Sequence, residues 1–210
     1  RFVDGPNVYA YVGNNPWNLV DPAGMNGLNL FNGSQPDFYN VGRWLERADT
    51  RNFYISAHAS NAAIQDQRRT RNPGPDQVWD ANELADYLTN PANDSGWAAG
   101  QEIWLLACEL GADTFASELA DRLNVVVWAP DGFVEFTGPL GVRDESTLTV
   151  GSTGPNNTRE GDSVWRAWGP DGQEIPGAVV RQILVERGER PVLTDRQWVP
   201  PATGTRIRRD

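Results

Sequence analysis

Lysine is absent from this sequence, and cysteine and histidine each occur only once. All 18 basic residues are arginine. A single cysteine excludes an intramolecular disulfide bond, and one cysteine with one histidine is too few for a zinc site built from these two residue types. We therefore expect neither a metal nor another cofactor.

Long hydrophobic runs and excess positive charge are also lacking. No apolar run reaches the ~20 residues that a membrane-spanning helix needs, and no signal peptide is recognisable, so we expect no membrane span. The net charge of −10 repels phosphate backbones, so nucleic acid is not an expected partner. A composition of 39% hydrophobic and 22% charged residues is typical of a folded domain.

The first 25 residues differ from the remainder because they are rich in Asn, Gly and Pro. The segment N-V-Y-A-Y-V-G-N-N-P-W-N-L-V-D-P-A-G, which begins at Asn7, carries the turn signals Asn14-Asn15-Pro16 and Asp21-Pro22-Ala23-Gly24. This segment resembles the C-terminal end of the core of RHS/YD-repeat proteins. The resemblance covers residues 1–25 and predicts a domain boundary there, with a separate domain at 26–210.

The RHS resemblance implies a biological context for that second domain. In this family a β-cage encloses a variable C-terminal toxin, and an aspartyl site of the cage cuts after a D-P-x-G-L motif. The cut here would follow Met25, where the family usually has Leu. The resemblance therefore implies a secreted toxin, released by autoproteolytic processing and delivered into the cytosol of a target cell. Its expected partners are the RHS cage of its own precursor, a target-cell protein as substrate and a cognate immunity protein.

Strand-like and helix-like stretches alternate over residues 28–135, which predicts an α/β core with a parallel sheet between helices. The expected strands are Leu28–Phe31, Asn52–Ala57, Glu102–Ala107 and Val125–Ala129, and the expected helices are Asp37–Asp49, Asp80–Asn90 and Gly111–Leu123. The polar stretch 61–78 is expected to be a loop.

The pattern then changes to short strands separated by Gly/Pro turns, which predicts a β-rich extension over about 136–210 that extends or covers the sheet. The strands expected after Val125–Ala129 are Phe133–Phe136, Thr147–Val150, Ser163–Trp168 and Ala178–Leu184.

The only histidine and the only cysteine each follow a predicted core strand. His58 comes directly after Asn52–Ala57, and Cys108 directly after Glu102–Ala107. Neighbouring parallel strands end at the same edge of a sheet, where ligands bind in open α/β folds. Taken singly, Cys108 also fits a small buried side chain and His58 a polar loop residue. Taken together, their equivalent positions favour a catalytic pair.

The chemistry of such a pair is nucleophilic catalysis. An imidazole can take the proton of a thiol, and the resulting thiolate attacks a carbonyl carbon. The helix expected from Gly111 would add backbone N–H groups and the positive end of its dipole close to Cys108.

The neighbouring residues resemble caspase-like (clan CD) cysteine peptidases, which carry His-Gly after one strand and Ala/Gly-Cys after the next. The matches are His58-Ala59 and Ala107-Cys108, separated by about 50 residues as in caspases. The resemblance covers residues 50–132 and implies a three-layer, mostly parallel sheet flanked by helices. It also implies an oxyanion hole formed by the backbone N–H groups of Ala59 and Cys108. Two departures are Ala59 in place of Gly, and Gly111 one position later than the family's glycine.

Three further residues are candidates for the substrate pocket, namely Ser56, Glu109 and Asp131. Asp131 follows the expected strand Val125–Ala129, where caspase-like folds build their pocket, and a carboxylate there would favour a basic residue before the cut bond. As a member of the turn Pro130-Asp131-Gly132, it also fits a purely structural role.

The sequence therefore predicts a cysteine peptidase toxin, with other classes left open. A deamidase or transglutaminase-like toxin would use the same cysteine and histidine on Gln or Asn side chains. An ADP-ribosyltransferase would need a different set, for which Arg143, Ser146-Thr147 and Glu186 are candidates. A binding module using the Trp-rich C-terminal strands would need no catalytic residue.

Overall fold

The computed structural model describes residues 27–33, 35–48, 52–60, 62–68, 77–93, 95–137, 145–151, 163–186, 192–194 and 197–198. The RHS-like segment, with the predicted cut after Met25, lies outside these residues, as does Arg143.

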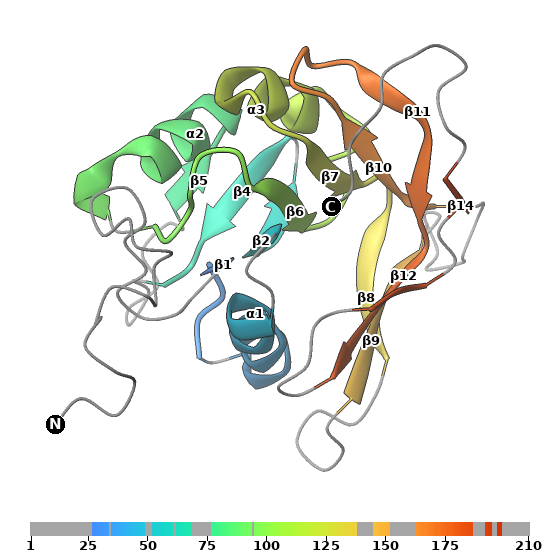
Figure 1. The fold of residues 1–210 in the computed structure, drawn as a ribbon. Coiled ribbons are helices and arrows are strands. Elements are labelled where there is room, and N and C mark those ends of the chain that lie inside the picture. Colours follow the sequence, from blue (N-terminus) through green and yellow to red (C-terminus); the bar gives the residue numbers. More distant parts are fainter. Residues whose placement is uncertain are drawn as a thin grey trace, which may run out of the picture.

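A mixed sheet of seven strands forms the centre of the α/β fold (Figure 1). Its order is β1 (Gly27–Asn29), β2 (Asn52–Ser56), β6 (Glu102–Leu106), β7 (Val127–Pro130), β10 (Trp165–Trp168), β11 (Glu174–Val180) and β14 (Gln197–Trp198). The first three pairings are parallel and the last three are antiparallel.

The expectation of a mostly parallel sheet is therefore wrong for its C-terminal half. The α/β crossovers that produce parallel pairs end with β7. The short turn around Gly172, which has a φ of 70°, then reverses the chain between β10 and β11, and a tight hairpin of this kind joins only antiparallel strands.

Helices cover both faces of the central sheet. The helix α1 (Pro36–Ala48) packs on one face, and α2 (Ala81–Thr89) and α3 (Phe115–Leu123) pack on the other (Figure 1). The helix α2 begins as its sequence predicts, because Asp80 and Glu83 form a reciprocal capping box with each other's backbone N–H groups. One 3-10 turn, Pro91–Asn93, follows α2.

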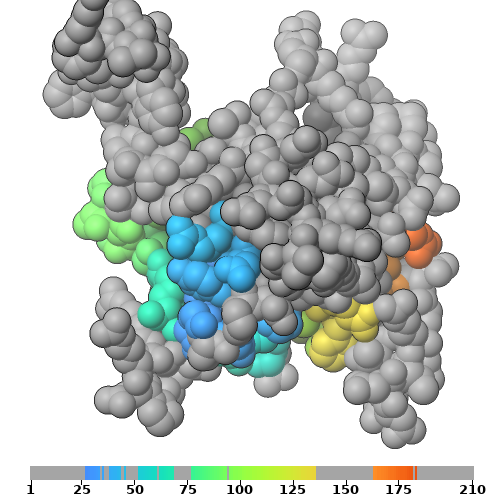
Figure 2. Space-filling view, turned by 90° about the horizontal axis from the view of Figure 1, so that it is seen from below, coloured from blue at the N-terminus to red at the C-terminus, as the bar shows by residue number. Residues whose placement is uncertain are grey.

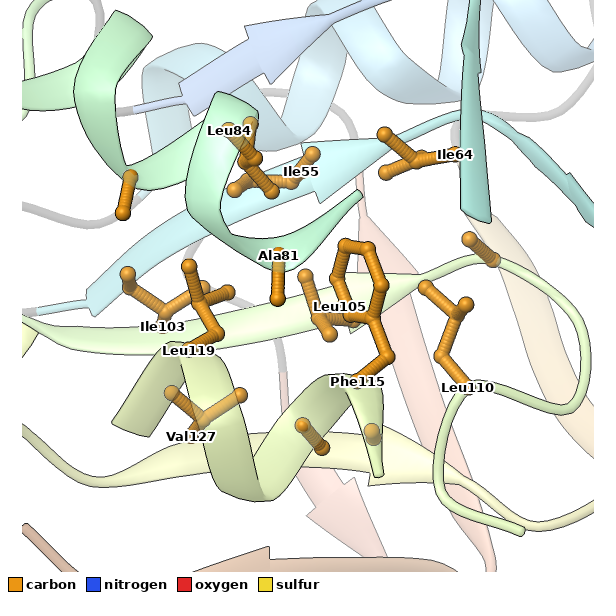
Figure 3. Packing of buried hydrophobic residues seen from close by; sticks show 14 of the residues in the cluster. Ile55, Ile64, Ala81, Leu84, Ile103, Leu105, Leu110, Phe115, Leu119 and Val127 are labelled. Atoms are coloured by element: carbon orange, nitrogen blue, oxygen red, sulfur yellow. The ribbon is translucent and has the colours of Figure 1, made fainter. Parts of the chain in front are cut away.

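Alternation along the strands divides the core into two clusters. On the α2/α3 face, Ile55 and Leu105 lie under Leu84, Phe115 and other helical side chains (Figure 3). On the α1 face, the cluster joins strand and helix residues with residues of the C-terminal strands: Val41, Leu45, Tyr54, Trp104, Leu106, Trp128, Trp165, Ala167, Ala178, Val180 and Ile183. In β2 and β6, the even-numbered residues therefore point to the α1 face and the odd-numbered residues to the α2/α3 face.

Two smaller sheets flank the central one. The four-stranded sheet has the order β13 (Val192–Thr194), β12 (Gln182–Glu186), β9 (Glu145–Gly151) and β8 (Phe133–Thr137). The C-terminal strands therefore both extend the central sheet and form a second one. The expected strand Ala178–Leu184 is in fact two strands, because the chain passes from one sheet to the other at Arg181.

The three-stranded sheet consists of β3 (His58–Ser60), β4 (Ala63–Asp66) and β5 (Gln77–Trp79). It corrects the expectation that 61–78 is a loop. In β4 one fully buried residue, Ile64, stands among polar neighbours, and the buried carboxylate of Asp66 binds Arg68 at 2.9 Å. Because one of the inward residues of β4 is a carboxylate, β4 shows little of the alternation of apolar and polar residues by which strands are recognised in a sequence.

Candidate active site

The strands that precede His58 and Cys108 are adjacent and parallel, as predicted. The register of β2 and β6 pairs Asn52 with Glu102 and Ser56 with Leu106, so equivalent residues are 50 positions apart in sequence. The match continues past the strands, because the N–H of Ala57 donates to the carbonyl of Leu106 at 3.4 Å. His58 and Cys108 thus lie beyond the same edge of the sheet. Each comes two residues after the last pair of the register, Ser56 with Leu106.

Both residues also belong to the α1 face of the sheet. Tyr54 and Trp104 occupy that face, and His58 and Cys108 share their parity. The contacts agree with this placement. The imidazole touches Phe38 of α1, and the sulfur lies by the backbone of Val134, whose side chain packs on the α1-face cluster. Figure 2 shows this side of the molecule, with the surface around α1 in blue and that of β8 in yellow.

The imidazole of His58 is held by one amide and two aromatic rings. Its Nε2 lies 2.8 Å from Oε1 of Gln35. The ring of Phe31 meets it edge-on at a centroid distance of 4.9 Å, and the ring of Phe38 does so at 5.4 Å. All three contacts come from the segment between β1 and the first turn of α1.

That segment is itself fastened to the sheet by Asn29, a buried polar residue of β1. Its Nδ2 donates to the carbonyl of Tyr39 in α1 at 2.8 Å, and its Oδ1 accepts from the N–H of Phe31 at 3.2 Å. A Cβ on Gly42 would come within 2.7 Å of this side chain, so only glycine lets α1 approach so closely. The segment that contains Gln35 is therefore held by Asn29 at both ends, at Phe31 before it and at Tyr39 after it.

Cys108 lies in a turn that is anchored on the end of β7. The N–H of Glu109 donates to the carbonyl of Gly132 at 2.9 Å, and the N–H of Gly111 donates to the carbonyl of Pro130 at 2.8 Å. Glu109 has a φ of 60°, in the left-handed region that few non-glycine residues adopt. Such strain persists only where the surroundings enforce it, and it is common at functional sites.

The expected helix start near Cys108 is wrong. The helix α3 begins at Phe115, not at Gly111, and residues 108–114 form turns and bends. The reason is that Gly111 packs against β7, where a Cβ would meet the carbonyl oxygen of Ala129 at 2.8 Å. The dipole of α3 therefore does not act on Cys108 from the next turn of chain, because its influence is confined to the first helical turn.

The thiol of Cys108 is half-buried. Burial raises the pKa of the Cys108 thiol above its ordinary value; the backbone N–H of Val134 lowers it, the negative charge of Glu109 raises it, and the N–H of Cys108 lowers it. The imidazole of His58 is not among the groups that shift this pKa. The structure thus brings the two residues to one edge and one face, with the imidazole bound to Gln35.

The pocket candidates fall in different places. Ser56 is only 3% exposed, and this burial argues against a role in an open pocket. Glu109 is exposed beside the thiol. The carboxylate of Asp131 already accepts from Nε of Arg166 and from the N–H of Val164, both at 2.7 Å, so it fastens β10 to the turn after β7. A basic substrate residue would have to displace Arg166.

The remaining candidates are placed by strand pairing. Ala59 lies in β3 and is paired with Ile64. Ser146 and Thr147 lie in β9 and pair with Val185 and Leu184 of β12, whereas Glu186 of β12 pairs with Glu145. Among the described residues, no group of three or more His, Cys, Asp or Glu side chains is arranged to hold a metal ion.

Sequence reasoning missed Gln35, Phe31, Phe38 and Val134, which provide the contacts of the imidazole and the thiol. Gln35 lies just before a helix that the sequence does predict. Its position in the sequence could have indicated a role in the site, because the segment between β1 and α1 also crosses the edge where the parallel strands end. Val134 could not be found in this way, because its contribution is a backbone N–H.

The fold defines an α/β protein whose one cysteine and one histidine follow neighbouring parallel strands at equivalent positions. A family model described as a domain of unknown function (DUF8616) matches residues 26–150, and the chain belongs to this family. No curated protein matches the chain, and no solved structure matches it. In the part of the chain that the structure describes, no helix is long and apolar enough to cross a membrane.

Proposed function

We propose that this protein is a cysteine peptidase of caspase-like architecture, with Cys108 as the nucleophile and His58 as its base. The observation that carries the proposal is the register of β2 and β6, because the only histidine and the only cysteine each follow one of these adjacent parallel strands by the same two residues. Both have even numbers, like the residues of β2 and β6 that point to the α1 face. We propose that a peptide carbonyl binds between them on this face.

The reaction begins with a neutral thiol, in keeping with the raised pKa of Cys108. As Sγ attacks the carbonyl carbon of the peptide bond, His58 takes the thiol proton, so that charge separates only in the transition state. The tetrahedral intermediate collapses to a thioester, and the imidazolium gives its proton to the leaving amine. Water then attacks the thioester with His58 as base, which releases the acid and restores the thiol.

The developing oxyanion needs donors that are already in place. The backbone N–H groups of Cys108 and Ala59 are the proposed donors, on the resemblance to caspase-like enzymes. The N–H of Glu109 is occupied by Gly132, so it does not serve. The anchored turn 108–111 keeps the nucleophile in place while the charge develops.

The proposed biological role is that of a toxin released from an RHS cage and acting on a protein of the target cell. The match of the family model begins at residue 26, directly after the predicted cut at Met25. This coincidence supports a domain that is separated from the preceding segment by processing. Delivery into a target cytosol and a cognate immunity protein follow from the same RHS resemblance.

A comparison of variants tests the proposal. The chain is incubated with a proteome-derived peptide library, and new N-termini are identified by mass spectrometry. We expect cleavage by the wild-type protein and by Asp121→Asn, an exposed control in α3. Cys108→Ala should abolish cleavage, and His58→Ala should lower kcat/KM by about 10²- to 10⁴-fold. Circular dichroism checks that each variant is folded.

Other outcomes identify the rival classes. If Gln or Asn side chains gain the small mass of an amide-to-acid conversion while chains stay intact, the protein is a deamidase that uses the same two residues. If toxicity or modification of targets survives in folded Cys108→Ala, the peptidase proposal fails. An ADP-ribosyltransferase using Glu186, or a binding module, would then explain the activity.

A further inference from the structure

We propose that Gln35 is a positioning residue for His58, holding the imidazole in one tautomer and one orientation. The inference rests on the proposed function, because it assigns a role in the same reaction. Gln35 is assigned no contact with the substrate. It acts through the imidazole, as a third group that orients the catalytic base.

The hydrogen bond determines which ring nitrogen carries the proton. The amide Oε1 of Gln35 can only accept, so at 2.8 Å it receives the N–H of Nε2. A neutral imidazole with its proton on Nε2 has Nδ1 as its basic nitrogen. In the proposed reaction, Nδ1 of His58 is therefore the atom that takes the thiol proton.

The aromatic contacts restrict the rotation of the ring. Phe31 and Phe38 both meet the imidazole edge-on, with interplanar angles of 81° and 61°. A rotation that exchanged the two nitrogens would break the bond to Gln35 and push the ring against these neighbours. Orientation and tautomer are therefore set together.

The acceptor is fixed before any substrate binds. The N–H of Gln35 donates to the carbonyl of Asn32 at 3.3 Å, and its own carbonyl accepts from the N–H of Tyr39 at 2.9 Å. Gln35 lies directly before α1, in a segment separate from the strand that carries His58. Because the amide is neutral, it orients the imidazole without adding a charge that would favour the imidazolium.

Three variants separate hydrogen bonding from shape. Gln35→Met keeps the length of the side chain and removes the acceptor, and Gln35→Glu keeps an acceptor oxygen. Asn40→Met is the control, since Asn40 is exposed on α1, the helix that directly follows Gln35. We expect Gln35→Met to lower kcat by roughly 10- to 100-fold with little change in KM, the loss typical for residues that orient a functional imidazole. Gln35→Glu should retain most of the activity.

A spectroscopic readout is available because the chain has one histidine. In protein labelled with ¹⁵N-histidine, the ring-nitrogen shifts of the folded wild type should report the tautomer protonated at Nε2. In Gln35→Met they should report a mixture of the two tautomers, and in Asn40→Met they should match the wild type. This measurement needs neither a substrate nor turnover.

The two failures are distinguishable. If Cys108→Ala is inactive but Gln35→Met has the kcat and the ring-nitrogen shifts of Asn40→Met, the role of Gln35 is overturned and the peptidase stands. If the ring-nitrogen shifts of Gln35→Glu report the same mixture of tautomers as those of Gln35→Met, Gln35 does not act as an acceptor and the inference is also overturned. If folded Cys108→Ala remains active, the proposed function itself is wrong.

Discussion

Single residues at the sheet edge show how local contacts set the chemistry of a side chain. Cys108 and Glu109 are adjacent, and the carboxylate of Glu109 acts against ionisation of the thiol. Backbone N–H groups act in the opposite direction, but burial has the largest effect on the pKa. These surroundings therefore oppose ionisation of the thiol, and the proposed mechanism needs its base for each attack.

The pH dependence of alkylation tests this description. The thiolate is the reactive form, and a raised pKa leaves less of it at neutral pH. We predict that iodoacetamide labels Cys108 with a half-maximal rate at higher pH in the folded protein than in the urea-unfolded protein. Glu109→Gln should shift the folded profile to lower pH, because it removes a charge that raises the pKa. Quantitative mass spectrometry of the labelled peptide gives the rates.

A matched substitution checks the cause of that shift. Glu118→Gln removes the same charge from the exposed side of α3 and should leave the alkylation profile unchanged. Equal profiles for Glu109→Gln and the wild type would show that the carboxylate does not act on the thiol.

Among the elements, the contact between α1 and β1 has the most direct bearing on the site. Asn29 joins β1 to α1, and Gly42 leaves room for its side chain. The same segment carries Gln35 to the imidazole. A change in the spacing of these two elements would therefore move the contacts of His58 as well.

We predict that Gly42→Ala destabilises the protein by about 1–3 kcal/mol, as overpacking in a core does. The added Cβ would lie 2.6 Å from Cγ of Asn29, which is held by two hydrogen bonds and cannot give way without losing one. Urea denaturation gives the free energy of unfolding. Gly33→Ala is the control, since its Cβ would meet nothing within 4 Å, and it should change stability by less than ~0.5 kcal/mol.

The elements also show what could be predicted from the sequence. The strands β2 and β6 and the helix α2 were predictable because their apolar runs and capping residues are local signals. The start of α3 was not, because tertiary packing of Gly111 on β7 delays the helix to Phe115. The edge positions of His58 and Cys108 followed from the strands, whereas the bond to Gln35 depends on how the segment before α1 crosses the sheet.

For the whole molecule, the central sheet extends past the part that defines the family. The family match ends at residue 150, whereas β10, β11 and β14 lie beyond it and complete the sheet. The α1-face cluster includes Trp165 and Val180, both fully buried. The parallel and antiparallel halves therefore share one hydrophobic core.

We predict that a chain ending at Gly151 does not fold, although it contains all the residues matched by the family model. It would leave β7 without its partner β10 and would expose Trp104 and Trp128 on the α1 face. Near-ultraviolet circular dichroism and urea denaturation should show no cooperative transition. A chain ending at Trp198 should unfold cooperatively like the full chain. Cooperative unfolding of the shorter chain would contradict a shared core.

The ion pair between Asp131 and Arg166 has a consequence for the timing of maturation. The turn that holds Cys108 rests on Pro130 and Gly132, and Asp131 between them is fixed only once β10 is in place. On the ribosome, the proposed catalytic residues His58 and Cys108 emerge before Arg166, the arginine that holds Asp131. Under the proposed function, a nascent chain would therefore remain inert until Arg166 has been synthesised and has paired with Asp131.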